Sequence, residues 1–538
     1  MICMKPFLKI NDCARKELQL RQNFHRISVL SRQIKEKNQF GSDVRPVVFF
    51  NASTRLAGIS MNAAYSFLSS YAIELAGAPV IHFVCKKGLS HCVLGTSKDK
   101  VQNKPPCDVC LRTSKGIYAN RDVHWFSFQE DAELKKTIAD LDFEQLVSFS
   151  FQKIPLGELV LPSLRWIIRR HHLEDDENLR YLCREYILSA WSIAQEFKKL
   201  IANTNPQAVV VFNGMFYPEA LVRFVAKKHH IPVFTHEVGM QSFSAFFTSG
   251  EATAYPIDVS REFSLSEDQE ARLNDYLTKR FQGDFVTAGI RFWPEMHKMD
   301  DNFWQKAKQF KQFVPVFTNV VFDTSQAHAN VVFPQMFAWL DVVLNSIREH
   351  PETLFAFRAH PDELRPGKES RESVQQWVEK NQVAKLPNVI FIHSNDYMSS
   401  YDLIDQAKFV MVYNSTVGLE ASIKGKPVLC AGKARYTQLP TVFFPKTQSE
   451  FIKFLNEFLN SKQIKVPPEF ITNSRKVLYS QLFMASLPFE DFIEPDGIWN
   501  GFVRIKDFTL GKLEPENSVT MKTIVDGILY QGSFLLPS

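Results

Sequence analysis

The segment that decides the fold runs from residue 355 to 436, opening with Phe355-Ala-Phe-Arg-Ala-His-Pro361 and leading to Tyr413-Asn-Ser-Thr-Val-Gly-Leu-Glu420. The first piece predicts a buried strand that presents Arg358 and His360 on a loop fixed by a proline. The second predicts a strand, a tight polar turn and a helix. Small hydroxyl residues between a strand and a helix direct several backbone N–H groups at one point, which suits a phosphate. We therefore expect half of a nucleotide-sugar site here.

Length and composition bound the class of protein. A chain of 538 residues is too long for one comfortable core, so two large domains are expected. The net charge of +5 is too small to favour nucleic acid. It is compatible with anionic substrates or peripheral contact with an anionic membrane face. We expect no secretory signal and no membrane-spanning segment. The 8 Cys in so long a chain favour a reducing cytoplasm over a disulfide scaffold.

Short apolar strands alternate with polar loops and helices, which predicts an α/β fold with two doubly wound, Rossmann-like domains. Residues 122–146 are predicted to be mainly helical. The predicted organisation is an N-terminal helical extension (1–44), a first α/β domain (45–263) with a Cys-rich excursion (85–118), a helical bridge (264–310), a second α/β domain (311–448), and C-terminal helices and tail (449–538).

Ligands of open α/β sheets bind beyond the carboxyl ends of the strands. The polar segments expected there are 51–58, 213–218 and 236–239 in the first domain, and 319–325, 358–361, 394–401, 414–420 and 432–436 in the second. Two such edges facing each other across a cleft have the geometry of a two-substrate transferase.

Five motifs in this order resemble the bacterial capsule polysaccharide biosynthesis family, whose members are GT-B-type glycosyltransferases related to Kdo transferases. The resemblance is densest over residues 310–440 and extends to 213–219 and 236–239. The motifs are Phe317-Thr-Asn-Val-Val-Phe-Asp-Thr324, Arg358-Ala-His-Pro-Asp-Glu363, Ser399-Ser-Tyr401, Tyr413-Asn-Ser-Thr-Val-Gly-Leu-Glu420 and Gly425-Lys-Pro-Val-Leu-Cys-Ala-Gly-Lys-Ala-Arg-Tyr436.

The resemblance implies two Rossmann-like domains facing across a cleft, with the nucleotide-sugar donor held mainly by the C-terminal one. Several related families that use CMP-sugars have a His-Pro pair and serines near the donor phosphate, which favours a CMP-activated, Kdo-like donor. No Asp-x-Asp accompanies the donor motifs. We therefore expect chemistry that requires no metal or other cofactor.

Roles on the donor side follow from chemistry. His360, with Arg358, is predicted to stabilise the charge that builds on the departing nucleotide; the alternative is a surface pair at a strand end. Glu420 is suited to accept both ribose hydroxyls, or it lies on a solvated helix face. Each hydroxyl residue taken singly is also a potential helix N-cap. The predicted donor-binding residues are Arg358, Ser399, Ser400, Asn414, Ser415, Thr416, Gly418 and Glu420.

The reaction also needs a group that activates the acceptor hydroxyl. His236 and Glu237, at a strand end of the first domain, are the best candidates for a general base, and Glu237 is alternatively a nucleophile-like carboxylate. Asp323 is the second choice, and its alternative role is to cap the segment that follows it. Asn213, Ser53 and Gly58 are predicted to line the acceptor side.

Cys85, Cys92, Cys107 and Cys110 form a separate group with the spacing C-x6-C-x14-C-x2-C, preceded at the second pair by two prolines. This spacing predicts a tetrahedral structural zinc site, in which His91 is an alternative ligand. The other interpretation is a buried strand thiol and three loop thiols. Because the group lies in an excursion, we expect a structural role.

The sequence thus predicts a cytoplasmic glycosyltransferase, acting at the inner face of the membrane, that moves a sugar from a nucleotide donor to a surface polysaccharide or lipid-linked acceptor. One alternative is another enzyme of the same fold, a sugar-nucleotide epimerase or a polyol-phosphate transferase. A different class is a non-catalytic subunit that binds nucleotide sugars. No nucleic-acid partner is expected.

Overall fold

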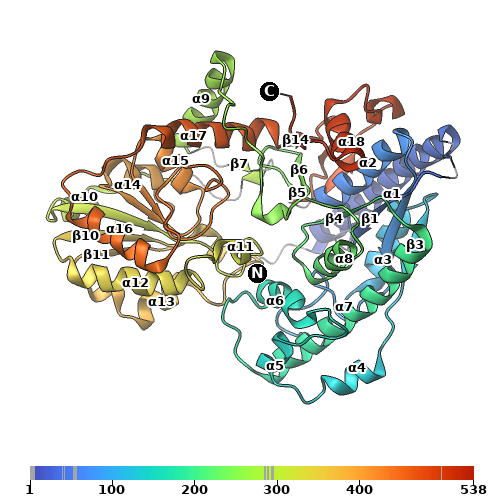
Figure 1. The fold of residues 1–538 in the computed structure, drawn as a ribbon, viewed down its shortest axis with the longest axis horizontal. Coiled ribbons are helices and arrows are strands. Elements are labelled where there is room, and N and C mark those ends of the chain that lie inside the picture. Colours follow the sequence, from blue (N-terminus) through green and yellow to red (C-terminus); the bar gives the residue numbers. More distant parts are fainter. Residues whose placement is uncertain are drawn as a thin grey trace.

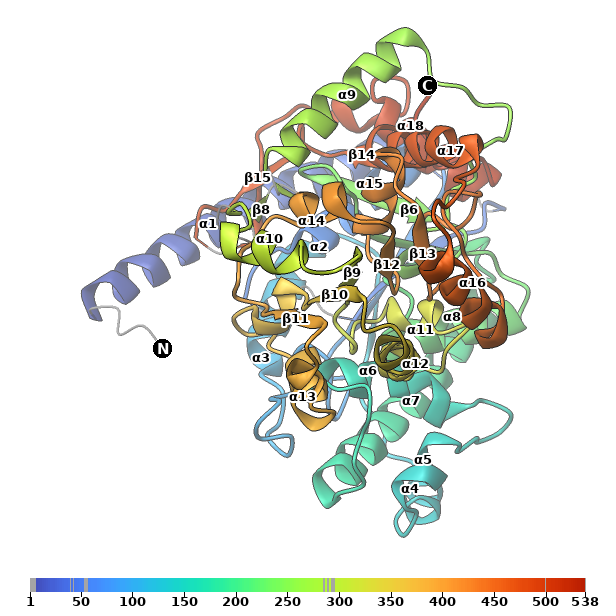
Figure 2. The ribbon, with the colours of Figure 1, turned by 90° about the vertical axis from the view of Figure 1, so that its left-hand side faces the viewer.

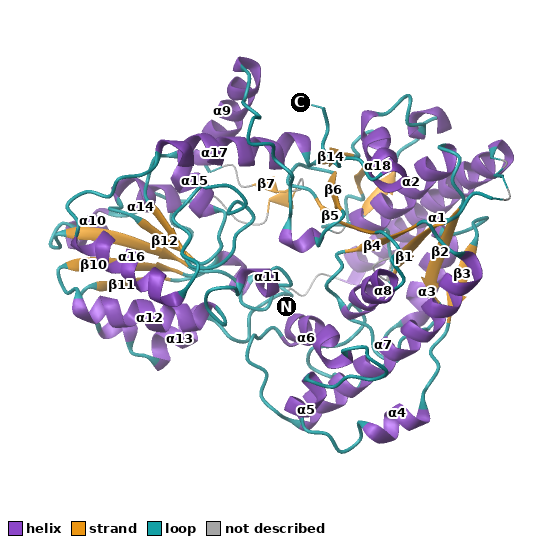
Figure 3. Ribbon diagram, in the orientation of Figure 1, coloured by secondary structure: helices purple, strands orange, loops and turns teal. Residues whose placement is uncertain are grey.

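The computed structural model describes residues 6–38, 40–41, 43–52, 57–283, 286–287, 290–291, 296–498 and 500–537. Two α/β units lie side by side, each a twisted sheet between helices (Figure 1). The strands of each sheet and the helices that cover both of its faces are distinguished in Figure 3. The predicted fold class, α/β with two Rossmann-like sheets, is confirmed.

The first sheet, over the described residues, has seven strands. The strand β6 pairs antiparallel with both of its neighbours, β5 and β14, and the other pairs are parallel. When the parallel strands are numbered in chain order, their order across the sheet is 3-2-1-4-5, the doubly wound arrangement. The spatial order is β14 (Leu487–Pro488), β6 (Ser244–Thr248), β5 (Val233–Val238), β4 (Ala208–Phe212), β1 (Val47–Asn51), β2 (Val80–Cys85) and β3 (Val123–Phe126).

Successive residues of a strand point to opposite faces, and β1 shows how this divides the core. Val47 and Phe49 pack with α1, α2, α3 and α18, whereas Val48 and Phe50 pack with α4 to α8. The helix bounds are α1 (Pro6–Lys37), α2 (Met61–Leu75), α3 (Cys107–Ile117) and α18 (Val519–Tyr530), then α4 (Ala132–Thr137), α5 (Phe143–Val147), α6 (Leu156–Ile168), α7 (Glu177–Thr204) and α8 (Tyr217–Lys228).

The second sheet is parallel throughout its five described strands and repeats the order 3-2-1-4-5. Its strands, in spatial order, are β11 (Val389–Ile392), β10 (Thr353–Arg358), β9 (Gln312–Phe317), β12 (Val410–Val412) and β13 (Val428–Cys430). One face packs against α12 (Met336–Glu349), α13 (Val374–Lys380) and α16 (Gln448–Asn460). The other packs against α9 (Glu267–Phe281), α10 (Asp301–Ala307), α14 (Ser400–Gln406), α15 (Val417–Ile423) and α17 (Pro468–Tyr479).

Short elements complete the described fold. The strands β7 (Val286–Thr287) and β8 (Ile290–Arg291) pair with each other, as do β15 (Ile493–Pro495) and β16 (Val503–Ile505). The helix α11 (Gln326–Ala329) follows β9, and the 3-10 turn η2 (Pro361–Leu364) follows β10. No helix in the described ranges is both long and apolar enough to cross a membrane.

Residues 449–538 form more than C-terminal helices and a tail. After α17 the chain crosses back to the first unit, where β14 pairs with β6 through Leu487 and Ala245. Helix α18 then packs on α2 in the first core. The weak apolar pattern of this region gave no indication that it completes the first unit. Its partners in that unit lie more than 200 residues away in sequence.

The predicted bridge packs into the core of the second unit, and the N-terminal extension packs into the core of the first unit. Leu273 and Phe303, from the 264–310 segment, are buried in the core of the second unit. In α1, Asn23 accepts a hydrogen bond from the backbone N–H of Ile505 at 2.9 Å through its side-chain oxygen. Figure 2 shows the first turns of α1 projecting beyond the rest of the fold. The prediction that 122–146 is mainly helical misses β3, a four-residue edge strand too short to show a pattern.

Candidate active site

The carboxyl edges of the two sheets face a common cleft. It consists of two adjoining cavities, of about 430 Å³ and about 490 Å³, that share Trp166, Asp323, Thr416 and Arg435 among their lining residues. The smaller is lined mainly by the second unit, whereas the larger also includes the ends of β1, β4 and β5. These volumes are in the range of small-molecule sites, and their place at the carboxyl ends of parallel strands is the usual one.

Glu237, near the end of β5, is the carboxylate that the first unit presents to the cleft. Its Oε2 accepts a hydrogen bond from Nδ2 of Asn213 at 2.9 Å, and its Oε1 accepts one from Nδ2 of Asn62 at 3.1 Å. Burial raises the pKa of Glu237, and the negative charge of Asp323 across the cleft raises it further. The two amides hold the carboxylate in one orientation, so the arrangement suits a base that ionises at a higher pH than an ordinary glutamate.

The prediction that His236 serves as a base is wrong. Adjacent residues of a strand point to opposite faces, so His236 points into the core while Glu237 faces the cleft. The imidazole is fully buried, its ring centroid lies 5.3 Å from that of Phe247, and neither ring nitrogen has a hydrogen-bond partner. Burial lowers the pKa of His236 to about 3, which keeps the ring neutral.

His360 lines the smaller cavity, directly after β10. Its Nδ1 accepts a hydrogen bond from the backbone N–H of Asp362 at 3.1 Å, so in the neutral ring the proton is on Nε2. Burial lowers the pKa of His360, which favours the neutral ring near pH 7. The side chain is therefore a neutral hydrogen-bond donor at the edge where the resemblance expects a phosphate.

Several basic side chains of the same cavity were not singled out by the sequence. Lys433 and Arg435 lie in the loop after β13, a segment that was expected at the cleft but given no role. The guanidinium of Arg435 lies 4.8 Å from the ring centroid of Tyr255. The hydroxyl of Thr253 is 2.8 Å from Nε2 of His328. The cationic side chains and histidines that line this cavity are His328, His360, Arg365, Lys368, Lys433 and Arg435.

The turn after β12 meets the cleft as expected. Asn414, Ser415 and Thr416 line the smaller cavity, and Thr416 reaches the larger one as well. Glu420, on α15, lines the larger cavity, but both of its oxygens have protein partners. Oε1 pairs with Nε of Arg280 at 3.1 Å and Oε2 accepts the hydroxyl of Tyr401 at 2.8 Å. A ribose would therefore share this carboxylate with Arg280 and Tyr401.

Three predicted donor ligands serve the scaffold instead. Arg358 is buried, and its guanidinium donates to the backbone oxygens of His393, at 2.9 Å, and Met398, at 3.4 Å. It thus holds the loop after β11. Ser399 caps α14 by accepting the Asp402 N–H at 3.3 Å, and neither it nor Ser400 lines the cleft. The helix-capping alternative was correct for Ser399, but the surface alternative for Arg358 was not, because the loop after β11 takes the hydrogen bonds of its buried guanidinium.

Gly418 is also structural. A Cβ at this position would lie 2.3 Å from the hydroxyl oxygen of Tyr436 and 3.0 Å from Cγ2 of Val412. The Tyr436 hydroxyl is itself fixed, because it donates to the backbone oxygen of Ser415 at 2.8 Å. The glycine therefore lets α15 approach the loop after β13 closely enough to form the polar turn that lines the cleft.

Replacing Gly418 by alanine is expected to destabilise the protein by about 1–3 kcal/mol, because the added methyl group overlaps the Tyr436 hydroxyl. Combining it with Tyr436→Phe removes that oxygen, so the double variant is expected to lose less stability than the sum of the two single losses. Urea unfolding of the four proteins of this cycle measures the effect. Additive losses would show that the contact with Tyr436 does not limit this position.

Asp323 lines both cavities from the loop after β9. Its Oδ2 accepts the hydroxyl of Ser325 at 2.5 Å, so the predicted capping contact with the segment after it exists alongside the cleft position. On the acceptor side, Asn213 lines the larger cavity. Gly58 does not, because it packs beneath Phe502, whose Cδ1 would lie 2.4 Å from a Cβ. Ser53 lies outside the described residues.

Cys85, Cys92, Cys107 and Cys110 lie apart from the cleft, around one small cavity of about 20 Å³. None of the four is in a disulfide. Within the described residues, no group of three or more His, Cys, Asp or Glu side chains stands ready to hold a metal ion. His91 does not line this cavity, and its Nδ1 lies 3.5 Å from Oε2 of Glu185.

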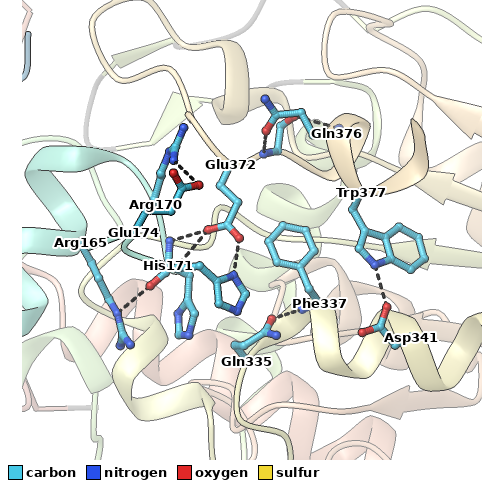
Figure 4. A network of polar contacts seen from close by, with 12 residues as sticks. Arg165, Arg170, His171, Glu174, Gln335, Phe337, Asp341, Glu372, Gln376 and Trp377 are labelled. Atoms are coloured by element: carbon cyan, nitrogen blue, oxygen red, sulfur yellow. Dashed lines mark hydrogen bonds and ion pairs between the residues drawn. The ribbon is translucent and has the colours of Figure 1, made fainter. Parts of the chain in front are cut away.

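A network of polar contacts joins the two units (Figure 4). Glu372, from the loop before α13, accepts hydrogen bonds from the backbone N–H groups of His171, at 2.8 Å, and His172, at 3.0 Å, and its carboxylate also contacts the His172 ring. The backbone N–H of Arg371 donates to the backbone oxygen of Arg169 at 3.0 Å. The Glu372 carboxylate is thus one of several groups that tie the second unit to the first.

Glu372→Ala is expected to lower the free energy of unfolding by about 1–3 kcal/mol, because three donors lose a charged acceptor. It is also expected to widen the cleft, seen as a larger radius of gyration by small-angle scattering. Glu379→Ala, on the exposed face of α13, is the matched control and should change neither quantity. Equal behaviour of the two variants would show that this contact does not hold the units together.

Comparison with known proteins agrees with the motifs. Residues 284–439 match the model of the family described as capsule polysaccharide biosynthesis protein. The protein FixF of Sinorhizobium fredii is 32% identical over 101 residues, which cover 19% of this chain and 21% of FixF. The match therefore spans about a fifth of that relative.

Among solved structures, the β Kdo 2,4 transferase KpsC of Thermosulfurimonas dismutans matches with 10% identity and a TM-score of 0.34, covering 52% of this chain and 80% of that one. Its β Kdo 2,7 transferase counterpart matches with 18% identity and a TM-score of 0.31, covering 54% and 81%. The S. aureus MnaA–UDP structure matches with 11% identity and a TM-score of 0.26, covering 91% and 97%. The predicted resemblance to the capsule polysaccharide biosynthesis family is thus confirmed by the family match over residues 284–439.

Proposed function

We propose that the protein is a glycosyltransferase that moves a sugar from a nucleotide-sugar donor to a hydroxyl group of a surface polysaccharide or glycolipid. One observation carries the proposal: a cleft between two doubly wound sheets has a basic, hydroxyl-rich wall on one side and the half-buried carboxylate of Glu237 on the other. A basic wall suits a departing nucleotide, and an oriented carboxylate suits an acceptor hydroxyl. The family match over residues 284–439 supports the same class of activity.

On the donor side, the developing negative charge would fall among His360, Lys433 and Arg435. His360 would donate a hydrogen bond from Nε2 to a phosphate oxygen as the bond from the sugar to the nucleotide breaks. Lys433 and Arg435 would add positive charge, and the hydroxyls of Ser415 and Thr416 would complete the set of donors. Such preorganised donors stabilise the transition state more than the ground state. In this proposal no metal ion takes part in the transfer.

On the acceptor side, Glu237 would take the proton of the attacking hydroxyl. The acceptor oxygen forms a bond to the anomeric carbon, the proton passes to a carboxylate oxygen, and the nucleotide departs with the bonding electron pair. The amides of Asn62 and Asn213 keep the carboxylate directed at the cleft during this step. Asp323, on the facing wall, is the second candidate for the base.

A thermal-shift screen with CMP, CDP, UDP and GDP tests the donor half. A ligand that binds only the folded state raises the melting temperature by mass action. We expect the largest shift with CMP, because the motifs resemble those of enzymes that use CMP-activated sugars. A shift confined to UDP would overturn this choice of donor, and the absence of any shift would contradict the nucleotide-sugar site.

Product analysis tests the reaction. The expected result is that the matching nucleotide sugar is consumed with an acceptor glycan present, and that EDTA does not stop the turnover. Conversion of the donor alone would indicate an epimerase, and transfer of a polyol phosphate would indicate the related transferase. Strong nucleotide binding without any turnover would favour a non-catalytic binding subunit. The same proposal places the enzyme in the cytoplasm at the inner membrane face, which fractionation of cells checks.

A further inference from the structure

The excursion that follows β2 brings four thiols together from separate parts of the chain. Cys85 ends β2, Cys92 lies in the loop after it, and Cys107 and Cys110 lie in the first turn of α3. All four line one cavity of about 20 Å³, otherwise lined mainly by apolar side chains. A space of this size holds a single small occupant, since a water molecule needs roughly 10–15 Å³. The fold therefore gathers these thiols around a space that has room for one small occupant.

Two of the sulfurs accept backbone hydrogen bonds in the same local pattern. The N–H of Gly88 lies 3.1 Å from the sulfur of Cys85, and the N–H of Gly95 lies 3.2 Å from that of Cys92. In both cases the donor follows the cysteine by three residues. A Cβ at Gly95 would lie 2.7 Å from both the Cys92 sulfur and Cβ of Pro105. These turns supply N–H donors that would stabilise negative charge on sulfur, which metal-bound thiolates require.

The nearby groups that compete as ligands have other partners. His91 is buried beside Glu185, and its ring packs edge-on against Tyr181 at 5.4 Å between centroids. Asp108, between the last two cysteines, pairs with Lys87 at 2.7 Å on the surface. Among the side chains that line this cavity, the four sulfurs are therefore the candidate metal ligands. Four sulfurs around a small void suit a single tetrahedral ion better than an iron–sulfur cluster, which is larger.

We propose that Cys85, Cys92, Cys107 and Cys110 bind one structural Zn²⁺ as a four-thiolate site. No such group is preformed in the described residues, so binding would draw the four sulfurs inward. The thiol protons are released to solvent as the ion binds. This inference is independent of the proposed function, because it concerns the metal content of the protein and not its turnover.

The zinc site would also fix the loop that it closes. Residues 93–106 lie between the two cysteine pairs, and their tip contacts the second unit. Nζ of Lys98 lies 3.1 Å from Oε2 of Glu369, and Arg371 donates to the backbone oxygen of Lys98 at 3.2 Å and contacts Asp99. These contacts lie next to Glu372 in the same loop of the second unit. Ordering this loop by a metal ion would therefore stabilise the position of the two units.

Metal analysis of the full-length protein, purified under reducing conditions without chelators, tests the proposal. We expect one zinc ion per chain in the wild type and in Cys183→Ala, the matched control from the core of α7. The double variant Cys107→Ser/Cys110→Ser is expected to lose the zinc. A mercurial that blocks thiols should release zinc from the folded wild type, which keeps the test valid if the double variant does not fold.

Other outcomes would overturn the site. Wild-type protein without stoichiometric zinc, or a double variant that keeps it, would show that these cysteines do not bind the ion. Iron together with acid-labile sulfide would show that the site holds a cluster instead. Replacement of zinc by Co²⁺ is expected to give the intense visible absorption of tetrahedral thiolate coordination. A weak, octahedral-type spectrum would contradict the proposed ligand set.

Discussion

Replacing Glu237 by glutamine is expected to lower kcat for sugar transfer by about 10²–10⁴-fold, the usual contribution of a general base. Glutamine keeps the size of the side chain, so nucleotide binding on the opposite wall should be unchanged in a thermal-shift titration. The measurement is release of the nucleotide that the ligand screen identifies, with saturating acceptor. Normal transfer by this variant would remove Glu237 from the mechanism and direct attention to Asp323.

The pH dependence gives a second test of the same residue. A base must be ionised to work, so kcat/KM should fall as the pH falls through the pKa of Glu237, which burial raises above its ordinary value. In Glu237→Gln, the residual activity should no longer show this decrease in kcat/KM at low pH. Glu219→Gln is the matched control, because burial raises the pKa of Glu219 to about 8 but the side chain does not line the cleft. The Glu219→Gln control should still show the decrease in kcat/KM at low pH.

Replacing His360 by alanine is expected to lower kcat by about 10²–10³-fold, comparable to the removal of one preorganised donor from an oxyanion site. His360→Gln keeps an N–H donor, so it should recover part of the lost rate, which a merely structural role would not explain. The control is His350→Ala, at the amino end of the same strand, where the ring pairs with Glu352 at 3.1 Å. Wild-type rates in His360→Ala would contradict the predicted role in leaving-group stabilisation.

The strands were predictable where the sequence is continuously apolar. The run around Phe355 is buried on both faces of the second sheet, and such strands read as hydrophobic runs without alternation. The strand β14 escaped notice because it is stabilised by pairing with a distant partner, Leu487 with Ala245. The local sequence of a strand does not indicate a pairing with a strand so far away in the chain.

The same limit explains the errors at the cleft. His236 and Glu237 are neighbours in a polar strand end, and the sequence does not reveal which of two consecutive residues faces the ligand. Arg358 looked like a phosphate ligand because it ends a strand, but the loop after β11 folds over it and takes its hydrogen bonds. Lys433 and Arg435 were missed because a basic residue in a loop is ordinarily a solvated surface group.

The sequence by itself determined the two doubly wound units and the polar segments at the carboxyl edges, since periodicity and turn chemistry are local properties. Only the tertiary structure decided which side chains meet across the cleft. Glu237 lies between Asn62 and Asn213, and Glu372 joins the second unit to the first, through contacts that span 24 to 201 residues. Such contacts depend on how the elements pack in three dimensions, because a side chain's partners are set by distance in space and not by position along the chain.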